Sequence, residues 1–566
     1  MKTRILVFVL LMAMAVCLWS CGGTDEPQTD TQSAQNGEVT EEQSETNTPP
    51  TKQKVSLGIT KGKIPLYQVV YPAGLGEDSR TAVTDFILDV YEKTGVQLPI
   101  TSDSASASDN KKEIIICGTT RSASKDMSSI SYAEYGMEAL EDGTILVWGY
   151  GNTYLDKALG YLLNGMVKMQ DGGYYYKGLV SIESSGSDIL AELPKATFGK
   201  VDGVYESADD VYQVTVGEAQ LNDFKAYKSL LANGGYTLHA ENTIDSKNVF
   251  ATYKNDKYAI HLGYHGNTSQ MEIIIEKLGY LPSATAPTYT KKVSASITQM
   301  KLGSGGGMSY VIQLEDGSLV VIDGGLSDYT ARKELLTVLQ SKNARTDFEK
   351  PRVTWMFTHA HPDHIQLAAD FLNENSKNIE LVLVCANFID QNSKYASTIG
   401  DGYSHATLMN IIRSKYPRAE IMNFHTGQTL KLAGCEIDFY LTHEDIYPVA
   451  VGTLNSTSSV WRMDFGGKTF MVLGDTTETG AEILNAYYGS TLKSTVMQAA
   501  HHGVTASSGT TNIKALYANI LPDVVMWANA DKAAVEKFAG NKDILARSGL
   551  VSIYSNEIKS YLIENN

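Results

Sequence analysis

Three histidines and one aspartate within six positions point most directly to chemistry in this sequence: His359, His361, Asp363 and His364. A strand-like run rich in β-branched and aromatic residues, 353–358, precedes them, and an apolar-periodic helix follows. Alternation at the strand end sends His359 and His361 to one side, and the turn at the intervening proline lets Asp363 and His364 reach a second point nearby. Zinc and similar divalent metals take imidazole nitrogen and carboxylate oxygen as ligands. The spacing therefore predicts two metal ions close together.

Two such ions form a hydrolytic site. They lower the pKa of a bridging water from ~15.7 to near neutrality, which gives a hydroxide nucleophile at physiological pH. The same ions polarise the substrate oxygen and stabilise the charge that develops on it. Eight of the eleven histidines lie between His359 and His502, so we expect the chemistry of the chain to be concentrated in this stretch.

The run THAHPDH is similar to the HxHxDH signature of the metallo-β-lactamase-fold superfamily at all four ligand positions. Three other stretches resemble motifs of this family and occur in the same order. They are the strand-like run 319–322 followed by Asp323-Gly324-Gly325, the run 469–474 that ends in Asp475, and the run 495–500 followed by His501-His502-Gly503. The resemblance covers about residues 293–566. It implies an α/β fold, an αβ/βα four-layer sandwich, for the C-terminal half.

The resemblance also implies a role for each motif residue. The expected metal ligands are His359, His361, Asp363, His364, Asp475 and His501. Asp475 would bridge both ions, and Asp323 would orient a metal-binding histidine from behind. Asp363 and Asp475 would orient the attacking water, and His501 or His502 would protonate the leaving alkoxide. We favour His501 over His502 as the last ligand because it ends the strand directly.

The third ligand of the first ion departs from the pattern of the hydrolytic lactamases. Many members place a histidine there, but the matching stretch here is 454–460, which contains Asn455. This stretch is similar to the Asn-x-x-Ser run of the branch containing the extracellular domain of the DNA-uptake channel protein and the phosphorylcholine esterase. A neutral amide binds zinc more weakly than imidazole does, so zinc is favoured and manganese is its competitor. His443, which follows a strand-like run, is the alternative third ligand.

The N-terminus is typical of an exported bacterial lipoprotein. Lys2 and Arg4 precede an apolar run, 5–19, which is shorter than the ~20 residues needed to span a membrane and therefore indicates a signal peptide. The run 18–23 resembles a lipobox, which implies that Cys21 is lipidated and becomes the mature N-terminus. Acyl chains contribute ~0.8 kcal/mol per buried methylene, so we expect the protein to be anchored to a membrane at the cell surface or cell envelope.

Composition divides the 566 residues into five segments. These are a lipoprotein signal peptide (1–20), a disordered acidic tether (21–54), an α/β accessory domain that resembles the domain at the N-terminal side of several glycoside hydrolases (55–195), a small α+β module (196–290) and the metallo-β-lactamase-like hydrolase domain (291–566). His239, His261 and His265 in the small module have no third partner at ligand spacing, so we expect surface or core-edge histidines. Cys117, Cys385 and Cys435, which form no CxxC pair, are expected to be buried free thiols.

The predicted function is a surface-anchored, dinuclear metal-dependent hydrolase, in the first place a phosphodiesterase acting on an envelope or extracellular phosphoester or a decorated glycan. One alternative is an extracellular nuclease-like enzyme, for which Lys394, Arg413, Lys415 and Arg418 could contribute to a local groove. The formal charge of −17 makes duplex nucleic acid an unlikely partner, because such binding depends on Lys and Arg. The other alternative is a glycan-binding lipoprotein with a structural metal site. No oligomeric state is indicated.

Overall fold

The structure is a computed structural model of the full chain. It describes residues 53–107, 110–208, 210–302, 307–390, 399, 405–447, 451–504 and 509–563. The predicted signal peptide, Cys21, most of the tether and Lys394 lie outside the described residues. Within the described part of the chain, no helix is both long and apolar enough to cross a membrane.

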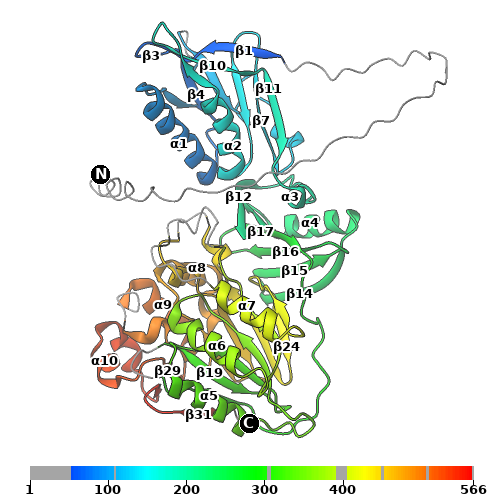
Figure 1. Cartoon of the computed structure of the whole chain (residues 1–566), viewed down its shortest axis with the longest axis vertical. Helices are drawn as coiled ribbons and strands as arrows, with labels where there is room; N and C mark the ends of the chain where they lie inside the picture. The colour runs from blue at the N-terminus through cyan, green and yellow to red at the C-terminus, as the bar shows by residue number, and fades with distance from the viewer. Residues whose placement is uncertain are drawn as a thin grey trace, which may run out of the picture. The chain divides into compact units, whose positions relative to one another are not determined.

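The first described region is built on a six-stranded sheet in the order β11-β7-β8-β6-β4-β5. Its strands are β4 (Tyr67–Tyr71), β5 (Ile100–Ser102), β6 (Lys112–Ile116), β7 (Glu134–Ala139), β8 (Ile145–Trp148) and β11 (Ser181–Ser185). The four strands β4, β5, β6 and β8 are parallel, and β7 and β11 are antiparallel to their neighbours. Helices α1 (Glu77–Thr94) and α2 (Gly151–Asn164) pack against each other on one face of the sheet (Figure 1). A smaller sheet joins β1 (Lys54–Gly58), β10 (Tyr174–Leu179) and β9 (Met166–Lys168).

A second six-stranded sheet follows, here called the middle sheet, and all its strands are antiparallel. It consists of β12 (Lys200–Ala208), β13 (Val211–Gly217), β14 (Thr237–Asp245), β15 (Asn248–Lys254), β16 (Tyr258–His265) and β17 (Gln270–Lys277), with helix α4 at Leu221–Asn233. One face carries apolar side chains such as Ile260, Leu262 and Ile273, which belong to the same hydrophobic cluster as Val69 and Leu155 of the preceding region. The segments 55–195 and 196–290 therefore share one core.

The opposite face of the middle sheet is polar, yet it is buried. His261 and His265 of β16 are 4% and 0% exposed, and Glu272 of β17 is 5% exposed. The C-terminal region, residues 291–566, covers them: the ring of Tyr487 stacks on His265 with centroids 3.7 Å apart. The expectation that His261 and His265 are surface or core-edge residues is therefore wrong, because the side chains that bury them come from distant sequence.

His239 differs from the other two histidines of the middle sheet. It is partly buried near the strand edge, and its Nε2 lies 2.8 Å from the carbonyl oxygen of Pro282. His239 belongs to β14, which is an edge strand of the middle sheet. Among the described cysteines, Cys117, Cys385 and Cys435 are buried free thiols, as predicted.

The C-terminal region contains two seven-stranded sheets. The first has the order β23-β22-β21-β20-β19-β18-β31, with β18 (Ser296–Gln299), β19 (Ser309–Gln313), β20 (Leu319–Asp323), β21 (Arg352–Met356), β22 (Glu380–Cys385), β23 (Glu420–Met422) and β31 (Lys559–Leu562). The second has the order β24-β25-β26-β27-β28-β29-β30, with β24 (Thr429–Leu432), β25 (Cys435–Leu441), β26 (Val460–Asp464), β27 (Thr469–Val472), β28 (Val496–Gln498), β29 (Val524–Trp527) and β30 (Val551–Tyr554). Strands β20 to β23 run parallel, and so do β27 to β30.

Three hydrophobic clusters order these elements into four layers. Side chains of both sheets, including Tyr310, Trp461 and Phe470, form one core between them. Helices α5 (Tyr329–Lys342), α6 (Pro362–Glu374) and α7 (Ala406–Lys415) pack on the other face of the first sheet, and α8 (Glu478–Tyr488) and α9 (Thr511–Ile520) on the other face of the second (Figure 1). The C-terminal region is thus the expected αβ/βα four-layer sandwich.

The pH dependence of stability tests the buried polar face. Burial and the adjacent Asp445 raise the pKa of Glu272 well above its usual value, and burial raises the pKa of Asp445 to about 7. Above about pH 4.3 the unfolded chain releases protons that the folded pair keeps, so the free energy of unfolding falls as the pH rises through this window. We expect Glu272→Gln to lessen this fall by about 2 kcal/mol between pH 4.5 and 8.

Thermal unfolding at several pH values measures this difference, since the other titrating groups are common to both proteins. Glu241→Gln on the exposed part of β14 is the control and should keep the wild-type slope. An identical slope for Glu272→Gln and wild type would contradict the prediction.

Candidate metal centre

The four motifs meet because each one follows the end of a central parallel strand. Asp323 ends β20, the histidine run follows β21, Asp475 follows β27, and His502 follows β28. The carboxyl ends of parallel strands lie at one edge of a sheet, and the two sheets pack face to face, so their loops converge. Residues almost 180 positions apart in the sequence are thereby brought into contact.

Helix α6 begins earlier than expected from the sequence. His361 is its N-cap, Pro362 is its first residue, and Asp363 and His364 lie in its first turn instead of in a preceding loop. Proline suits this position, since its fixed φ is helical and its missing N–H would have no partner there. The helix start thus fixes the direction of Asp363 and His364.

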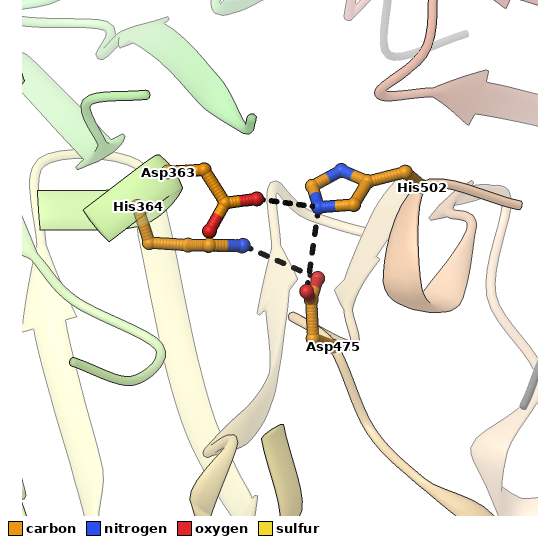
Figure 2. A group of neighbouring side chains, drawn as sticks. All are labelled: Asp363, His364, Asp475 and His502. Carbon is orange, nitrogen blue, oxygen red and sulfur yellow. Dashed lines mark hydrogen bonds and ion pairs between the residues drawn. The ribbon is translucent and has the colours of Figure 1, made fainter. Parts of the chain in front are cut away.

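Four side chains form one group, here called the tetrad: Asp363, His364, Asp475 and His502. Figure 2 shows them pointing toward one another. His364 Nε2 lies 3.3 Å from Asp475 Oδ1, and His502 Nε2 lies 3.3 Å from Asp475 Oδ2 and 3.1 Å from Asp363 Oδ2. Zinc bonds of 2.0–2.2 Å place neighbouring tetrahedral ligands ~3.3 Å apart. The tetrad therefore has the spacing of a metal-ligand set.

A second group, here called the His359 group, consists of His359, His361 and Asp475. His359 Nε2 lies 3.2 Å from His361 Nδ1 and 4.0 Å from Asp475 Oδ2. Asn455 completes its surroundings, with Oδ1 3.1 Å from His359 Nε2. Asp475 belongs to both groups, so its carboxylate lies between two possible ion positions.

Unpartnered buried atoms provide a separate test of whether the tetrad fits a cation. His364 Nε2 and Asp475 Oδ1 are both buried and make no hydrogen bond, although they face each other. An unsatisfied buried polar group costs about 1–3 kcal/mol. A divalent ion between these atoms would satisfy both, so the residues present fit such an ion.

Asp323 holds His364 in place from behind. Its carboxylate accepts hydrogen bonds from the Thr358 backbone N (2.8 Å), from Thr358 Oγ1 (2.7 Å) and from His364 Nδ1 (2.7 Å). The contact fixes the tautomer of His364 and directs its Nε2 at Asp475. The glycine after Asp323 allows this turn to lie under α6, because a Cβ on Gly324 would stand 2.6 Å from the backbone N of Ala368.

The His-His-Gly turn sets which histidine joins the tetrad. His501 (φ 49°), His502 (φ 58°) and Gly503 (φ 75°) are consecutive left-handed residues, a conformation that costs ~1–2 kcal/mol for each non-glycine residue. The chain reverses here, so that His502 reaches Asp363 while His501 Nε2 lies 3.1 Å from Asn455 Nδ2. His501 is the last ligand predicted from the sequence; His502 belongs to the tetrad, and His501 Nε2 lies next to Asn455 and 3.7 Å from Asp475 Oδ2.

The alternative third ligand, His443, lies elsewhere. It is buried, its Nε2 is 2.8 Å from Asn387 Oδ1, and its Nδ1 accepts a hydrogen bond from Tyr447. Asn455 is the residue next to His359. Two supporting residues lie in the motifs but had no predicted role. Thr358, the first residue of THAHPDH, links Asp323 to the histidine run, and Ser458, the serine of the Asn-x-x-Ser run, accepts a hydrogen bond at Oγ from the backbone N of Asp475 (3.0 Å).

Charges in the tetrad are strongly coupled. Burial opposes protonation of His502, but the Asp475 and Asp363 carboxylates outweigh it and raise the pKa of His502 to about 9. Burial lowers the pKa of His364, but the carboxylates of Asp475 and Asp323 have the larger opposite effect and raise it well above its usual value. Burial and His364 lower the pKa of His359 well below its usual value. Metal binding at the tetrad would therefore displace protons from imidazole.

The comparisons with known proteins find similarity in this region of the chain. Residues 302–383 match the family model described as the Metallo-beta-lactamase superfamily. Comparison with curated proteins gives no match. The four-layer sandwich and this match identify the C-terminal region as a metallo-β-lactamase fold that carries His and Asp groups able to hold divalent metals.

Solved structures with this fold are distant in sequence. The diiron β-hydroxylase CmlA from Streptomyces venezuelae is 12% identical with a TM-score of 0.31, over 49% of this chain and 55% of CmlA. Zn²⁺-bound PqqB from Methylobacterium extorquens is 11% identical with a TM-score of 0.31, over 47% of this chain and 99% of PqqB. Unliganded yeast PDE1 is 11% identical with a TM-score of 0.32, over 48% of this chain and 100% of PDE1. In the first of these matches the chain spans about half the length of CmlA.

Removing the support of His364 should weaken metal binding. Asp323→Asn keeps the shape of the side chain but loses the charge that holds Nδ1–H, and we expect a 10–100-fold loss of metal affinity. Competition with a coloured chelator measures it. Asp316→Asn is the matched control, since Asp316 is a buried carboxylate that pairs with Arg345 at 2.6 Å. Unchanged affinity in Asp323→Asn would contradict the role of Asp323.

The two adjacent histidines should differ in metal content. We expect His502→Ala to lose about one ion per chain, because it removes one of four tetrad ligands, and His501→Ala to lose less. Metal analysis after dialysis, with circular dichroism as the check on folding, separates the two variants. The reverse order would restore His501 as the ligand.

Proposed function

We propose that the C-terminal region is a dinuclear metal-dependent hydrolase and that the bond it cleaves is a phosphodiester. The observation that carries this proposal is the position of Asp475 in both the tetrad and the His359 group. A carboxylate shared in this way can hold two ions close together, and paired ions serve phosphatases, nucleases and other hydrolases.

Each side chain has a defined task in this proposal. A bound pair of divalent ions supplies water activation and charge stabilisation. His359, His361, His364 and His502 provide neutral nitrogen donors, and Asp475 provides the shared oxygen donor. Asp323 keeps His364 in one orientation throughout, so the site is assembled before substrate arrives.

Substrate would approach from the more exposed edge of the centre. The side chains of Asp363, His501 and His502 are 30%, 18% and 14% exposed, whereas those of His359 and His364 are 0% exposed. We assign His501 to a hydrogen bond with a phosphoryl oxygen. Burial lowers the pKa of His501, so its ring is neutral near pH 7 and can donate through one nitrogen.

The metal and the location are parts of the same proposal. Zinc is favoured by the nitrogen-rich donor set, and manganese is the alternative because Asn455 contributes only a neutral oxygen next to His359. The export signal and the lipobox-like cysteine support a lipid-anchored enzyme of the cell envelope, where phosphoesters of polymers, headgroups and decorated glycans occur. The first described region and the middle sheet would then serve as accessory parts.

Activity assays with a substrate panel test the function. We expect hydrolysis of bis-p-nitrophenyl phosphate or a phosphorylcholine ester, complete loss in EDTA, and recovery with zinc or manganese. His361→Ala should reduce kcat by more than the ~100-fold that loss of a supporting partner costs, and Asp316→Asn should retain activity.

Several outcomes would move the assignment. Full activity in EDTA would exclude the metal mechanism, and cleavage of a lactone or lactam without any phosphoester would change the bond. Turnover of single-stranded DNA alone would favour the nuclease. A His361→Ala protein that keeps full affinity for a glycan, with no hydrolysis by wild type, would indicate a binding protein.

A further inference from the structure

A second set of metal-type donors lies away from the proposed active site, where the middle sheet meets the C-terminal region. We call it the interface cluster: His261 of β16, Glu276 of β17 and His425, which precedes β24. Glu276 Oε1 lies 3.2 Å from His261 Nε2 and 3.4 Å from His425 Nε2. These separations equal the ~3.3 Å expected between ligands of a tetrahedral zinc ion. Two nitrogens and one oxygen thus converge as they do in the tetrad.

The remaining polar atoms of these side chains already have partners outside the cluster. His425 Nδ1 lies 3.0 Å from Glu444 Oε2, and His261 Nδ1 lies 3.2 Å from Thr252 Oγ1 and 3.1 Å from Gln428 Nε2. Metal-binding histidines usually donate their second N–H to a carboxylate or another oxygen, as His425 does to Glu444. Both Nε2 atoms are therefore the nitrogens directed at the shared carboxylate.

Glu276 is supported in the same manner. Its Oε2 accepts a hydrogen bond from Asn423 Nδ2 at 3.0 Å, which leaves Oε1 facing the two histidines. His425 Nε2 is buried and makes no hydrogen bond, although Glu276 Oε1 is within ion-pair distance. A fully buried imidazole nitrogen is thus aimed into the cluster without a satisfactory partner.

The charge balance also favours a cation. Two carboxylates, Glu276 and Glu444, are buried beside the two imidazoles, at 8% and 1% exposure. One protonated histidine would leave this site with a net negative charge, and buried charge is costly unless it is compensated. A divalent ion with two neutral histidines would bring the sum to zero.

We propose that the interface cluster is a third metal site, which takes a divalent transition metal of the zinc class through His261, Glu276 and His425. The fourth position of a tetrahedral ion is left for water. Because His261 and Glu276 belong to the middle sheet and His425 to the C-terminal region, the ion would join the two parts. Its role is structural, distinct from catalysis.

Metal content of the full-length protein tests this site. After loading with zinc and dialysis, we expect Asp475→Asn, which disrupts the active-site groups, to retain about one zinc per chain. Adding Glu276→Gln to this variant should remove that zinc, because a neutral amide is a poor ligand. Cobalt(II) loaded into Asp475→Asn should give visible absorption of a nitrogen- and oxygen-ligated ion, and the absorption should disappear in the double variant.

The control must perturb the same interface without touching the cluster. Gln213→Ala does so, because Gln213 Nε2 donates to the carbonyl oxygen of Glu444 at 3.0 Å. It should keep the zinc of the Asp475→Asn background. If Asp475→Asn retains no metal, or if Glu276→Gln leaves the metal content unchanged, the cluster is an ion-pair network only and the proposal is overturned.

Should Glu276→Gln fail to fold, His425→Gln in the Asp475→Asn background removes another ligand of the interface cluster, and its cobalt absorption and zinc content then decide between a metal site and an ion-pair network. Failure of this proposal would not affect the proposed hydrolase, since the phosphoester assays depend on the tetrad and the His359 group. Failure of the hydrolase would likewise leave the zinc count of the interface cluster unaltered.

Discussion

The burial of the Asp475 carboxylate is the constraint on which the rest of the structure depends. Asp475 is 1% exposed, and an ionised carboxylate at such a position is tolerated when positive or donor groups surround it. Those groups come from both sheets: His359 and His364 follow a strand of the first, and His502 follows a strand of the second. Each sheet alone holds part of a ligand set, so the apolar core between them determines the distances at the centre.

Local sequence patterns predicted much of this fold. The strands before the four motifs, predicted at 319–322, 353–358, 469–474 and 495–500, lie within a residue or two of these ranges. Such elements depend on periodicity and on residues close in sequence. The turn expected at Pro362 is instead the first turn of α6, because proline is favoured at the first helical position.

Two features could not be read from the sequence for a physical reason. The choice between His501 and His502 depends on backbone angles of consecutive left-handed residues, and residue type gives only a weak signal for them, since histidine is enriched at positive φ but is still uncommon there. The burial of His261 and His265 depends on side chains more than 150 residues away. Alternation along β16 correctly separates an apolar face from a polar one, but it does not show that a second layer of protein covers the polar face.

The middle sheet is therefore packed on both sides, by an apolar core on one face and by hydrogen bonds and ring contacts on the other. The C-terminal region lies very close to the middle sheet at Gly427, since a Cβ there would stand 2.0 Å from the ring of Phe250. A fragment cut near residue 290 would remove Gln213 from Glu444 and Glu276 from His425. The C-terminal region is thus not an independent unit, so an exchange of this region between related proteins would have to include the middle sheet.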